Sequence, residues 1–325
     1  MLFRSDLSIL KESLFEIVYV HNGYLEEKVK NDLKKKGCYV ICRENIGQDF
    51  GAWKDTFAFL EKNKIIKFLD WVLICNDSNF CLNGTNQKFI TTFERCLSNP
   101  KDIDFIALNC NLERQLHYQS YFICFGKEIL LSNSFKKFWE NYLPLNHRYH
   151  ANKKGEMKLT QKVLVHYRPE VILNNYNIYW KIFSQINKKD IHELISFFPK
   201  NYSSLEKCFD NSNLRNGLKK LIGLLESYNP SHVFALLNVK YLDSPFLKKD
   251  IVRNGLYSLS QVYDLLIALN LENDPKLLKE IMDLYSKKGT IYSYIPERRK
   301  RYRMGIPNFK EIPYSWQNES KILFE

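Results

Sequence analysis

Short runs of β-branched and aromatic residues recur through the first 125 positions of the chain. They lie at 15–20 (FEIVYV), 38–42 (CYVIC), 71–75 (WVLIC), 103–108 (IDFIAL) and 121–125 (YFICF). Runs of this length and composition predict β-strands. Apolar residues recur with helical spacing between most of these runs, over 24–36, 52–63 and 86–97. Alternating strands and helices predict an α/β fold, with a mostly parallel sheet flanked by helices.

The pattern changes after about residue 180. Long stretches rich in Leu, Ile and Lys follow with helical spacing, and they are interrupted by NPSH at 229–232 and DSPF at 243–246. We therefore expect two parts, with the sheet in 1–185 and a mainly helical region over 186–325.

The net charge of the chain indicates which classes of molecule it is expected to bind. The 325 residues include 48 Lys and Arg against 36 Asp and Glu, a formal net charge of +12. Such a balance favours partners that carry phosphate: a nucleotide, a nucleic acid or an anionic membrane surface. The densest basic cluster is ERRKRYR at 297–303, which fits either a solvated loop or a contact with phosphate or membrane. The sequence shows no motif of a DNA- or RNA-binding domain, so nucleic acid is not expected as a partner.

Cysteine usage and hydropathy bear on the compartment. The eight cysteines are scattered with no CxxC pair, and five of them lie in or beside the strand-like runs. They are expected to be reduced core residues of a cytosolic protein. No uninterrupted apolar run reaches the roughly eighteen residues of a membrane span, and the first twenty residues lack the features of a signal peptide. The sequence thus predicts a chain that does not cross a bilayer.

The segment RENIGQDFGAWK leads from a strand-like run into a helix, at the strand end where ligands of α/β folds bind. Gly47 and Gly51 permit positive φ or close approach of another backbone, and Asp49 can cap the helix. A helix amino terminus beside a strand end can bind an anion, with Arg43 and Lys54 available to phosphates. A strand-to-helix turn without further function accounts for the same residues.

Asp77 lies in NDS, directly after the apolar run WVLIC. An Asp at a strand end can hold a divalent cation that bridges a diphosphate, because Mg²⁺ takes one or two carboxylates together with substrate oxygens. The alternative is an Asx turn made by the side chains of Asn76, Asp77 and Ser78. The residues alone leave both interpretations open.

Two further places carry groups that can move protons. His117 and Gln119 lie in HYQS, immediately before the last strand-like run, and Glu156 follows Gly155 at the start of a predicted helix. His and Glu are common general acids and bases. The alternatives are a hydrogen-bonded structural His and a Glu that complements the helix dipole.

Taken in order, RENIGQDFGAWK, NDS, HYQSYFICF and GEMKLTQ resemble the rhamnan synthesis protein F family, glycosyltransferase-like proteins of bacterial surface polysaccharide assembly. DFGAWK is the specific part of this resemblance. NPSH and SPFLKKDIVRN, at 244–254, are also similar to the carboxyl-terminal pattern of the family, so the resemblance covers most of the chain.

The resemblance implies a GT-A-like, Rossmann-type domain for nucleotide-sugar binding in 1–185. The donor-binding residues that it implies are Arg43, Asn45, Gly47, Asp49, Gly51, Lys54, Asn76, Asp77 and Ser78. Arg43 and Lys54 would lie near the diphosphate. Asp77 would stand where related enzymes carry the second acid of a DxD motif that holds Mg²⁺ or Mn²⁺. Asn76 departs from an acid, so the resemblance leaves metal dependence open.

Glu156 gains a role from the resemblance, because similar inverting transferases use an acid at the start of a late helix to remove the proton of the acceptor hydroxyl. The sugar passes through an oxocarbenium-like state while a carboxylate within hydrogen-bond reach takes that proton. His117 is the second catalytic candidate, and Gln119 is expected to contact acceptor or donor.

The implied function is transfer of a sugar, such as L-rhamnose from dTDP-rhamnose, onto a lipid-linked glycan acceptor. A basic protein of this kind is expected to be cytoplasmic and peripheral, at the anionic inner face of the cytoplasmic membrane. The alternative is a catalytically inactive nucleotide-sugar-like domain that acts as an assembly or acceptor-binding subunit. Family members carry a strand ahead of the run at 15–20, where this sequence has only residues 1–14, and a missing strand would favour that alternative.

Overall fold

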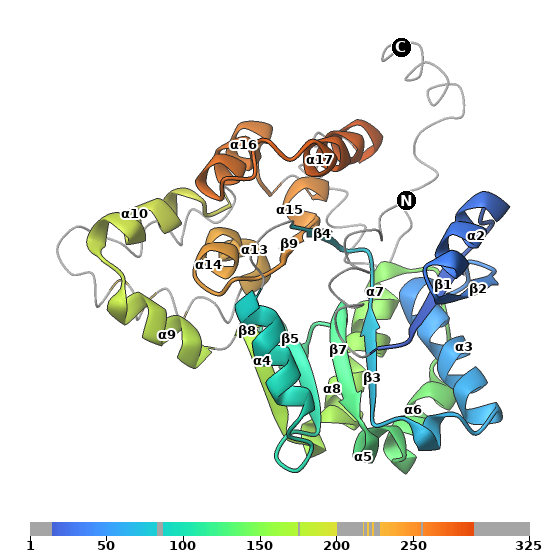
Figure 1. Ribbon diagram of the computed structural model, residues 1–325. Coiled ribbons are helices and arrows are strands. Elements are labelled where there is room, and N and C mark those ends of the chain that lie inside the picture. The colour runs from blue at the N-terminus through green and yellow to red at the C-terminus, as the bar shows by residue number, and fades with distance from the viewer. Residues whose placement is uncertain are drawn as a thin grey trace.

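The computed structural model describes residues 15–82, 87–174, 176–199, 228–254 and 256–288, with the isolated positions 217, 220 and 223 (Figure 1). All five predicted strands are present, shifted by up to three residues at either end. They are β1 (Ile17–Asn22), β2 (Cys38–Arg43), β3 (Trp71–Cys75), β5 (Phe105–Asn111) and β7 (Phe122–Gly126). The three predicted helices are α2 (Glu27–Lys35), α3 (Gln48–Lys62) and α4 (Gln87–Leu97). The α/β class is therefore confirmed.

The prediction of a mostly parallel sheet is wrong. The largest sheet has the order β3-β7-β5-β6, with β6 at His117–Tyr118, and β8 (Pro169–Asn174) also pairs with β5. Within it only β5 and β8 are parallel, and β1 and β2 form a separate parallel pair. The reason is the short connection from β5 to β7, residues 112–121, because a parallel crossover needs about a dozen residues or more and usually a helix.

Both faces of the large sheet are covered (Figure 1). Side chains of β5 and β7 alternate between the two faces, as strand geometry requires. Phe105, Ile123 and Phe125 belong to the cluster that contains Phe50 and Phe57 of α3. Ile106, Leu108, Phe122 and Cys124 belong to the cluster that contains Phe89 and Phe93 of α4. The helices that complete this part are α5 (Lys127–Leu130), α6 (Asn133–Asn141), α7 (Arg148–His150), the π-helix η2 (Ala151–Glu156), α8 (Met157–Lys162) and the 3₁₀ turns η1 (Ile66–Phe68) and η3 (Leu164–His166).

The cysteines of the described residues are free thiols. Cys38, Cys81, Cys96 and Cys124 are buried, as expected of reduced core residues. Cys42 is exposed, which corrects the expectation that every strand cysteine lies in the core. It shares a face of β2 with the buried Cys38 but lies near the end of the strand, where the small core around Cys38 and Leu33 no longer covers it.

A second core lies among the later helices. They are α9 (Tyr176–Gln185), α10 (Lys188–Ser196), α13 (Pro230–Val233), α14 (Ala235–Lys240), α15 (Asp250–Arg253), α16 (Leu259–Ala268) and α17 (Pro275–Lys288). Tyr179 of α9, on the amino-terminal side of the expected boundary, packs there against Phe234 with ring centroids 4.6 Å apart.

A short strand pair joins the two cores. β9 (Phe246–Lys248) pairs antiparallel with β4 (Asn79–Cys81), and Phe80 is fully buried in the second core. This pairing brings the segment after β9 beside the end of β3, which is what positions the candidate site.

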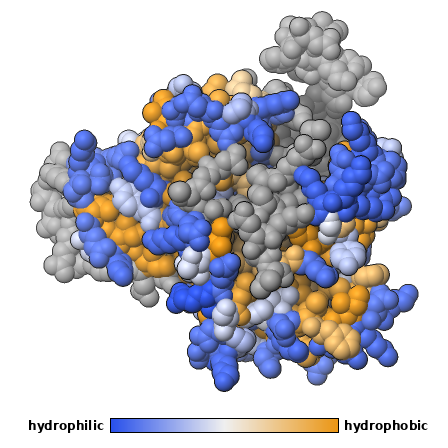
Figure 2. Space-filling model, in the orientation of Figure 1, coloured by the Kyte–Doolittle hydropathy of each residue, from blue (hydrophilic) through white to orange (hydrophobic). Residues whose placement is uncertain are grey.

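No helix in the described part of the chain is long and apolar enough to span a membrane. Hydrophilic side chains cover α2 almost completely in the view of Figure 2, while the carboxyl-terminal helices and the region around α3 and α6 show apolar patches.

Candidate functional site

Arg43, at the end of β2, holds the following turn together. Its guanidinium donates from Nε to Asp55 Oδ2 at 2.6 Å, from Nη1 to Asn22 Oδ1 at 2.6 Å and from Nη2 to the Ile46 carbonyl at 2.9 Å. The side chain is 12% exposed. These contacts give Arg43 a structural task in the apo protein, and its contact with a donor diphosphate stays a prediction.

The two glycines of the turn are required by close approach within the chain itself. Gly47 has a φ of 78°, and its N–H donates to Asn146 Oδ1 at 2.6 Å. A Cβ on Gly47 would overlap Pro144, and one on Gly51 would overlap the Ile46 carbonyl oxygen. A larger side chain at either position would therefore destabilise the turn itself. Loss of ligand binding in such a variant would not show that the glycine contacts the ligand.

Asn45 and Lys54 also bind neighbouring backbone and side-chain groups. The exposed Asn45 accepts on its carbonyl from Asn146 Nδ2 at 2.7 Å. Lys54 donates from Nζ to the carbonyls of Glu140 and Tyr142 at 3.0 and 2.6 Å, where it complements the carboxyl end of α6. The structure thus places the ammonium group of Lys54 on α6, and a role at the diphosphate stays a prediction.

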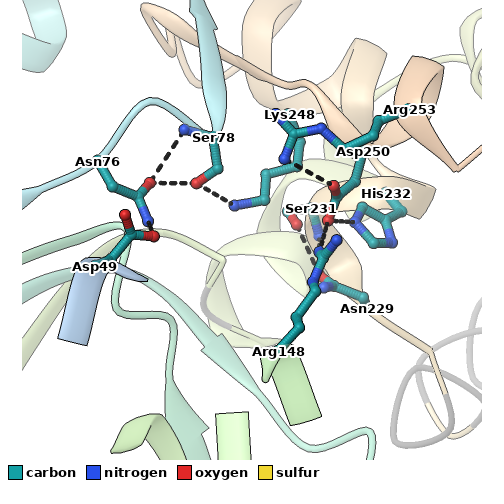
Figure 3. A network of polar contacts seen from close by, with 10 residues as sticks. All are labelled: Asp49, Asn76, Ser78, Arg148, Asn229, Ser231, His232, Lys248, Asp250 and Arg253. Atoms are coloured by element: carbon teal, nitrogen blue, oxygen red, sulfur yellow. Dashed lines mark hydrogen bonds and ion pairs between the residues drawn. The ribbon is translucent and has the colours of Figure 1, made fainter. Parts of the chain in front are cut away.

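Asp49 is the member of this segment that faces the strand end. It lies in the first turn of α3, and Asn76 Nδ2 donates to its Oδ2 at 2.9 Å (Figure 3). Asn76 Oδ1 in turn accepts from the Ser78 backbone N–H at 3.1 Å and from the Ser78 hydroxyl, so the predicted Asx turn forms. Burial, and secondly the charge of Asp77, raises the pKa of Asp49. Asp49, Asn76, Asp77 and Ser78 are therefore brought together.

Lys248 completes this group, and sequence reasoning gave it no role. β9 places its Nζ 3.2 Å from Ser78 Oγ and 3.7 Å from the centroid of the Tyr121 ring. Burial lowers the pKa of Lys248 to about 8, although the charges of Asp250 and Glu156 act to raise it. The signal in the sequence was the run SPFLKKDIVRN, which the family resemblance had already marked.

Two arginines and a histidine surround Asp250, next to Lys248 (Figure 3). Arg148 Nη2 lies 2.7 Å from Asp250 Oδ2, His232 Nε2 lies 3.8 Å from the same oxygen and Arg253 Nη1 lies 3.9 Å from Oδ1. Burial acts to raise the pKa of Asp250, but the cations, led by Arg148 and Lys248, hold it well below its usual range. The carboxylate therefore stays charged in the folded protein.

Two residues of the NPSH segment, Asn229 and Ser231, form the amino-terminal cap of α13. Asn229 is the N-cap of α13, and its Oδ1 accepts from the backbone N–H and the hydroxyl of Ser231 at 3.0 and 2.7 Å. This cap places His232 against Asp250. Burial lowers the pKa of His232 to about 4, so the imidazole is neutral near pH 7.

Glu156 and His117 form a second group. Glu156 is the last residue of the π-helix η2 rather than part of an ordinary first turn, and its Oε2 accepts from the backbone N–H and the hydroxyl of Ser120, both at 2.7 Å. Its Oε1 lies 3.5 Å from His117 Nε2, and His117 Nδ1 lies 2.7 Å from the Gln115 carbonyl. Both ring nitrogens of His117 thus face oxygen atoms. Ser120 thus holds one carboxylate oxygen of Glu156, while the other lies toward His117.

Tyr121 connects the two groups. Its carbonyl accepts from the Asn76 backbone N–H at 3.3 Å, and its ring lies beneath Lys248. Burial, and secondly the charge of Glu156, raises the pKa of Tyr121. Gln119 is buried two residues earlier, and its Oε1 has no hydrogen-bond partner among the residues that the structure describes. Carboxylates and cations from both parts of the chain thus meet at one site.

The described residues contain no group of three or more His, Cys, Asp and Glu side chains that could hold a metal ion. A metal at this site would need Asp77, with or without Asp49, together with oxygens from a substrate.

Two of the sequence predictions concern residues that the structure does not describe. The basic run at 297–303 and the amino-terminal residues 1–14 lie outside the described residues.

Comparison with known proteins gives a family and one distant relative. The family described as "Rhamnan synthesis protein F" matches residues 17–192 of the 325. An uncharacterized protein, y4gN of Sinorhizobium fredii (strain NBRC 101917 / NGR234), is 26% identical over 191 residues. That match covers 56% of this chain and 47% of the relative, so the chain spans about half of the relative's length. No solved structure matches.

Proposed function

We propose that this chain, which belongs to the rhamnan synthesis protein F family, is a glycosyltransferase that takes a sugar from a nucleotide-sugar donor. The family is one of polysaccharide synthesis. The observation that carries the proposal is that Lys248 lies over the ring of Tyr121 while Glu156 accepts hydrogen bonds from the neighbouring Ser120, close enough for its charge to act on Lys248. A cation for a diphosphate and a carboxylate for a hydroxyl proton are the two groups that inverting transfer needs, and here they share one site.

The donor diphosphate would lie against Lys248. Arg148 and Arg253, which contact the nearby Asp250, would add positive charge to the site. Negative charge develops on the leaving diphosphate as the glycosidic bond breaks. Fixed cations in a partly buried site stabilise that charge without reorganisation of solvent. Asp77, with Asp49 beside it, is where Mg²⁺ or Mn²⁺ would be held. Such a metal would supply further charge neutralisation at the diphosphate.

The acceptor hydroxyl would lose its proton to Glu156. Ser120 fixes the carboxylate through Oε2, and His117 lies next to Oε1 and can share or receive the proton. A carboxylate held in this way is oriented before the acceptor arrives, which lowers the entropic cost of reaching the transition state. Gln119, with its unpartnered Oε1, is the candidate for a hydrogen bond to either sugar.

The finer assignments follow the family description. We propose that the sugar is L-rhamnose, carried by a donor such as dTDP-rhamnose, and that the acceptor is a lipid-linked glycan precursor. Such an acceptor would place the protein at the inner face of the cytoplasmic membrane.

A donor-hydrolysis and transfer assay with a panel of nucleotide sugars, with and without Mg²⁺ or Mn²⁺, tests the activity. Release of nucleoside diphosphate from at least one donor is the expected result. Donor binding by thermal shift with no turnover, in the presence of rhamnan-type glycan acceptors, would instead support the alternative of an inactive acceptor-binding subunit, because a bound ligand raises apparent stability by mass action.

Affinity for a nucleoside diphosphate is predicted to fall as the pH rises past about 8. The pKa of Lys248 is lowered to about 8, so its ammonium is charged below that pH and neutral above it. At pH 9 roughly a tenth of the side chain is protonated, and affinity should have dropped by about tenfold. Isothermal titration calorimetry with a nucleoside diphosphate measures this directly.

Lys248→Arg is the matched control, since guanidinium stays charged throughout this range. Protonation of the ligand itself affects both proteins equally. A difference between the two curves of affinity against pH therefore reports the titration of residue 248. Parallel curves for wild type and Lys248→Arg between pH 7 and 9.5 would contradict the prediction, because they would show that loss of the Lys248 charge does not govern binding in this range.

A further inference from the structure

A groove lies between α6 and the helical segment 151–162, away from the contacts of Glu156. Its cavity volume is about 440 Å³, within the usual range for small-molecule sites. Lys137 and Phe138 line it from α6, and Lys154, Lys158 and Lys162 line it from the opposite wall. The three lysines of that wall recur at every fourth position, which puts them on one face of the helical segment.

The groove collects positive charge without compensation. None of the described residues that line it is acidic. Within the described part of the chain, Lys137, Lys154, Lys158 and Lys162 have no ion-pair or side-chain hydrogen-bond partner. The neighbouring Lys127 and Lys136 do pair, with Asp70 and Glu61. Lysines on an ordinary solvated face are usually interspersed with acids, so four unpaired ones around one concavity indicate an anionic ligand.

One other feature of the lining fits a ligand that is part polar and part apolar. Leu143 is 64% exposed at the same groove, beside Phe138. Apolar surface next to ammonium groups suits a phosphate that is attached to a larger organic group.

We propose that this groove binds a phosphate-bearing ligand, with Lys137, Lys154, Lys158 and Lys162 contacting the phosphate oxygens. The site is distinct from the candidate catalytic groups, because Glu156 lies on the same segment but turns to Ser120 and His117. The inference does not rest on glycosyl transfer. A membrane phospholipid headgroup and a soluble phosphorylated molecule share this chemistry, and the test separates them.

The test compares two triple variants of the full chain. Lys154→Gln/Lys158→Gln/Lys162→Gln removes three charges from the groove, and Lys28→Gln/Lys34→Gln/Lys35→Gln removes three exposed charges from α2, which hydrophilic side chains cover (Figure 2). All six lysines are exposed, so both variants should fold, as circular dichroism can verify. Binding is measured for inorganic pyrophosphate by calorimetry and for phosphatidylglycerol vesicles by flotation at low salt.

The groove variant is expected to lose roughly a hundredfold in affinity for at least one probe, while the α2 variant stays close to wild type. Lys248 is intact in both variants, so a pyrophosphate bound there cancels in the comparison. Loss for pyrophosphate identifies a soluble ligand, and loss for vesicles alone identifies a lipid headgroup. Equal binding by the two variants, or no binding of either probe by wild type, would overturn the proposal.

Discussion

Glu156→Gln is expected to lower the rate of sugar transfer by about 10²- to 10⁴-fold, the usual effect of removing a general base. Glutamine has the same shape and can still accept from Ser120 through its amide oxygen, so the loop and the donor site should keep their geometry. Its amide cannot take a proton from the acceptor hydroxyl. The kcat of transfer should therefore fall, while the affinity for donor, measured in the absence of acceptor, changes little.

Glu128→Gln is the matched control, since Glu128 is an exposed residue in the first turn of α5. It should transfer sugar at the wild-type rate. A purely structural role for Glu156 would lower the free energy of unfolding without this selective loss of kcat. Transfer by Glu156→Gln at the wild-type rate would move the base to Asp49, because a carboxyl whose pKa is raised by burial is better suited to accept a proton near neutral pH.

Local structure in the first part of the chain could be predicted well from the sequence. The run WVLIC forms β3 with the predicted bounds. A short run of apolar and β-branched residues that ends at Asn and Asp is a strong strand signal, because the polar residues favour a turn directly after it. Pairing direction was not predictable in the same way. It depends on the length of the connection between β5 and β7, and the two-residue strand β6 within that connection carries no periodic signal.

The candidate site was only partly predictable, for a related reason. Asp49, Asn76 and Ser78 come from segments that follow strands, and the rule of strand ends brings them together. Lys248 and Asp250 arrive through the pairing of β4 with β9, which are three residues each and far apart in the sequence. Such a contact has no local signature.

In the turn between β2 and α3, the sequence predicted what the glycines and cations can do but not which groups they contact. Gly47 and Gly51 were expected to permit close approach, and they do, but the approaching groups are Pro144 and Ile46 of the chain itself. Arg43 and Lys54 similarly satisfy backbone carbonyls and a carboxylate. Residue type predicted the physical property at these positions, while the partner depended on tertiary structure.

Asp250→Asn is expected to lower the free energy of unfolding by about 3 kcal/mol, the low end of the 3–5 kcal/mol typical of breaking a buried ion pair. The side chain of Asp250 is 5% exposed, and its oxygens lie 2.7 Å from Arg148 Nη2 and 3.9 Å from Arg253 Nη1. The substitution keeps the shape and removes the negative charge that faces the guanidinium groups of Arg148 and Arg253 and the ammonium group of Lys248. Arg148 is 43% exposed, so water screens part of its charge, and this places the effect at the low end.

Urea denaturation of Asp250→Asn beside Asp264→Asn measures the effect, since Asp264 is an exposed residue of α16 and should change the free energy by less than about 0.5 kcal/mol. A double-mutant cycle gives the cause. Arg148→Gln should destabilise wild type more than it destabilises Asp250→Asn, because the second background lacks the carboxylate that Arg148 contacts at 2.7 Å in wild type. Equal effects of Arg148→Gln in both backgrounds would show that the ion pair between Arg148 and Asp250 contributes nothing to stability.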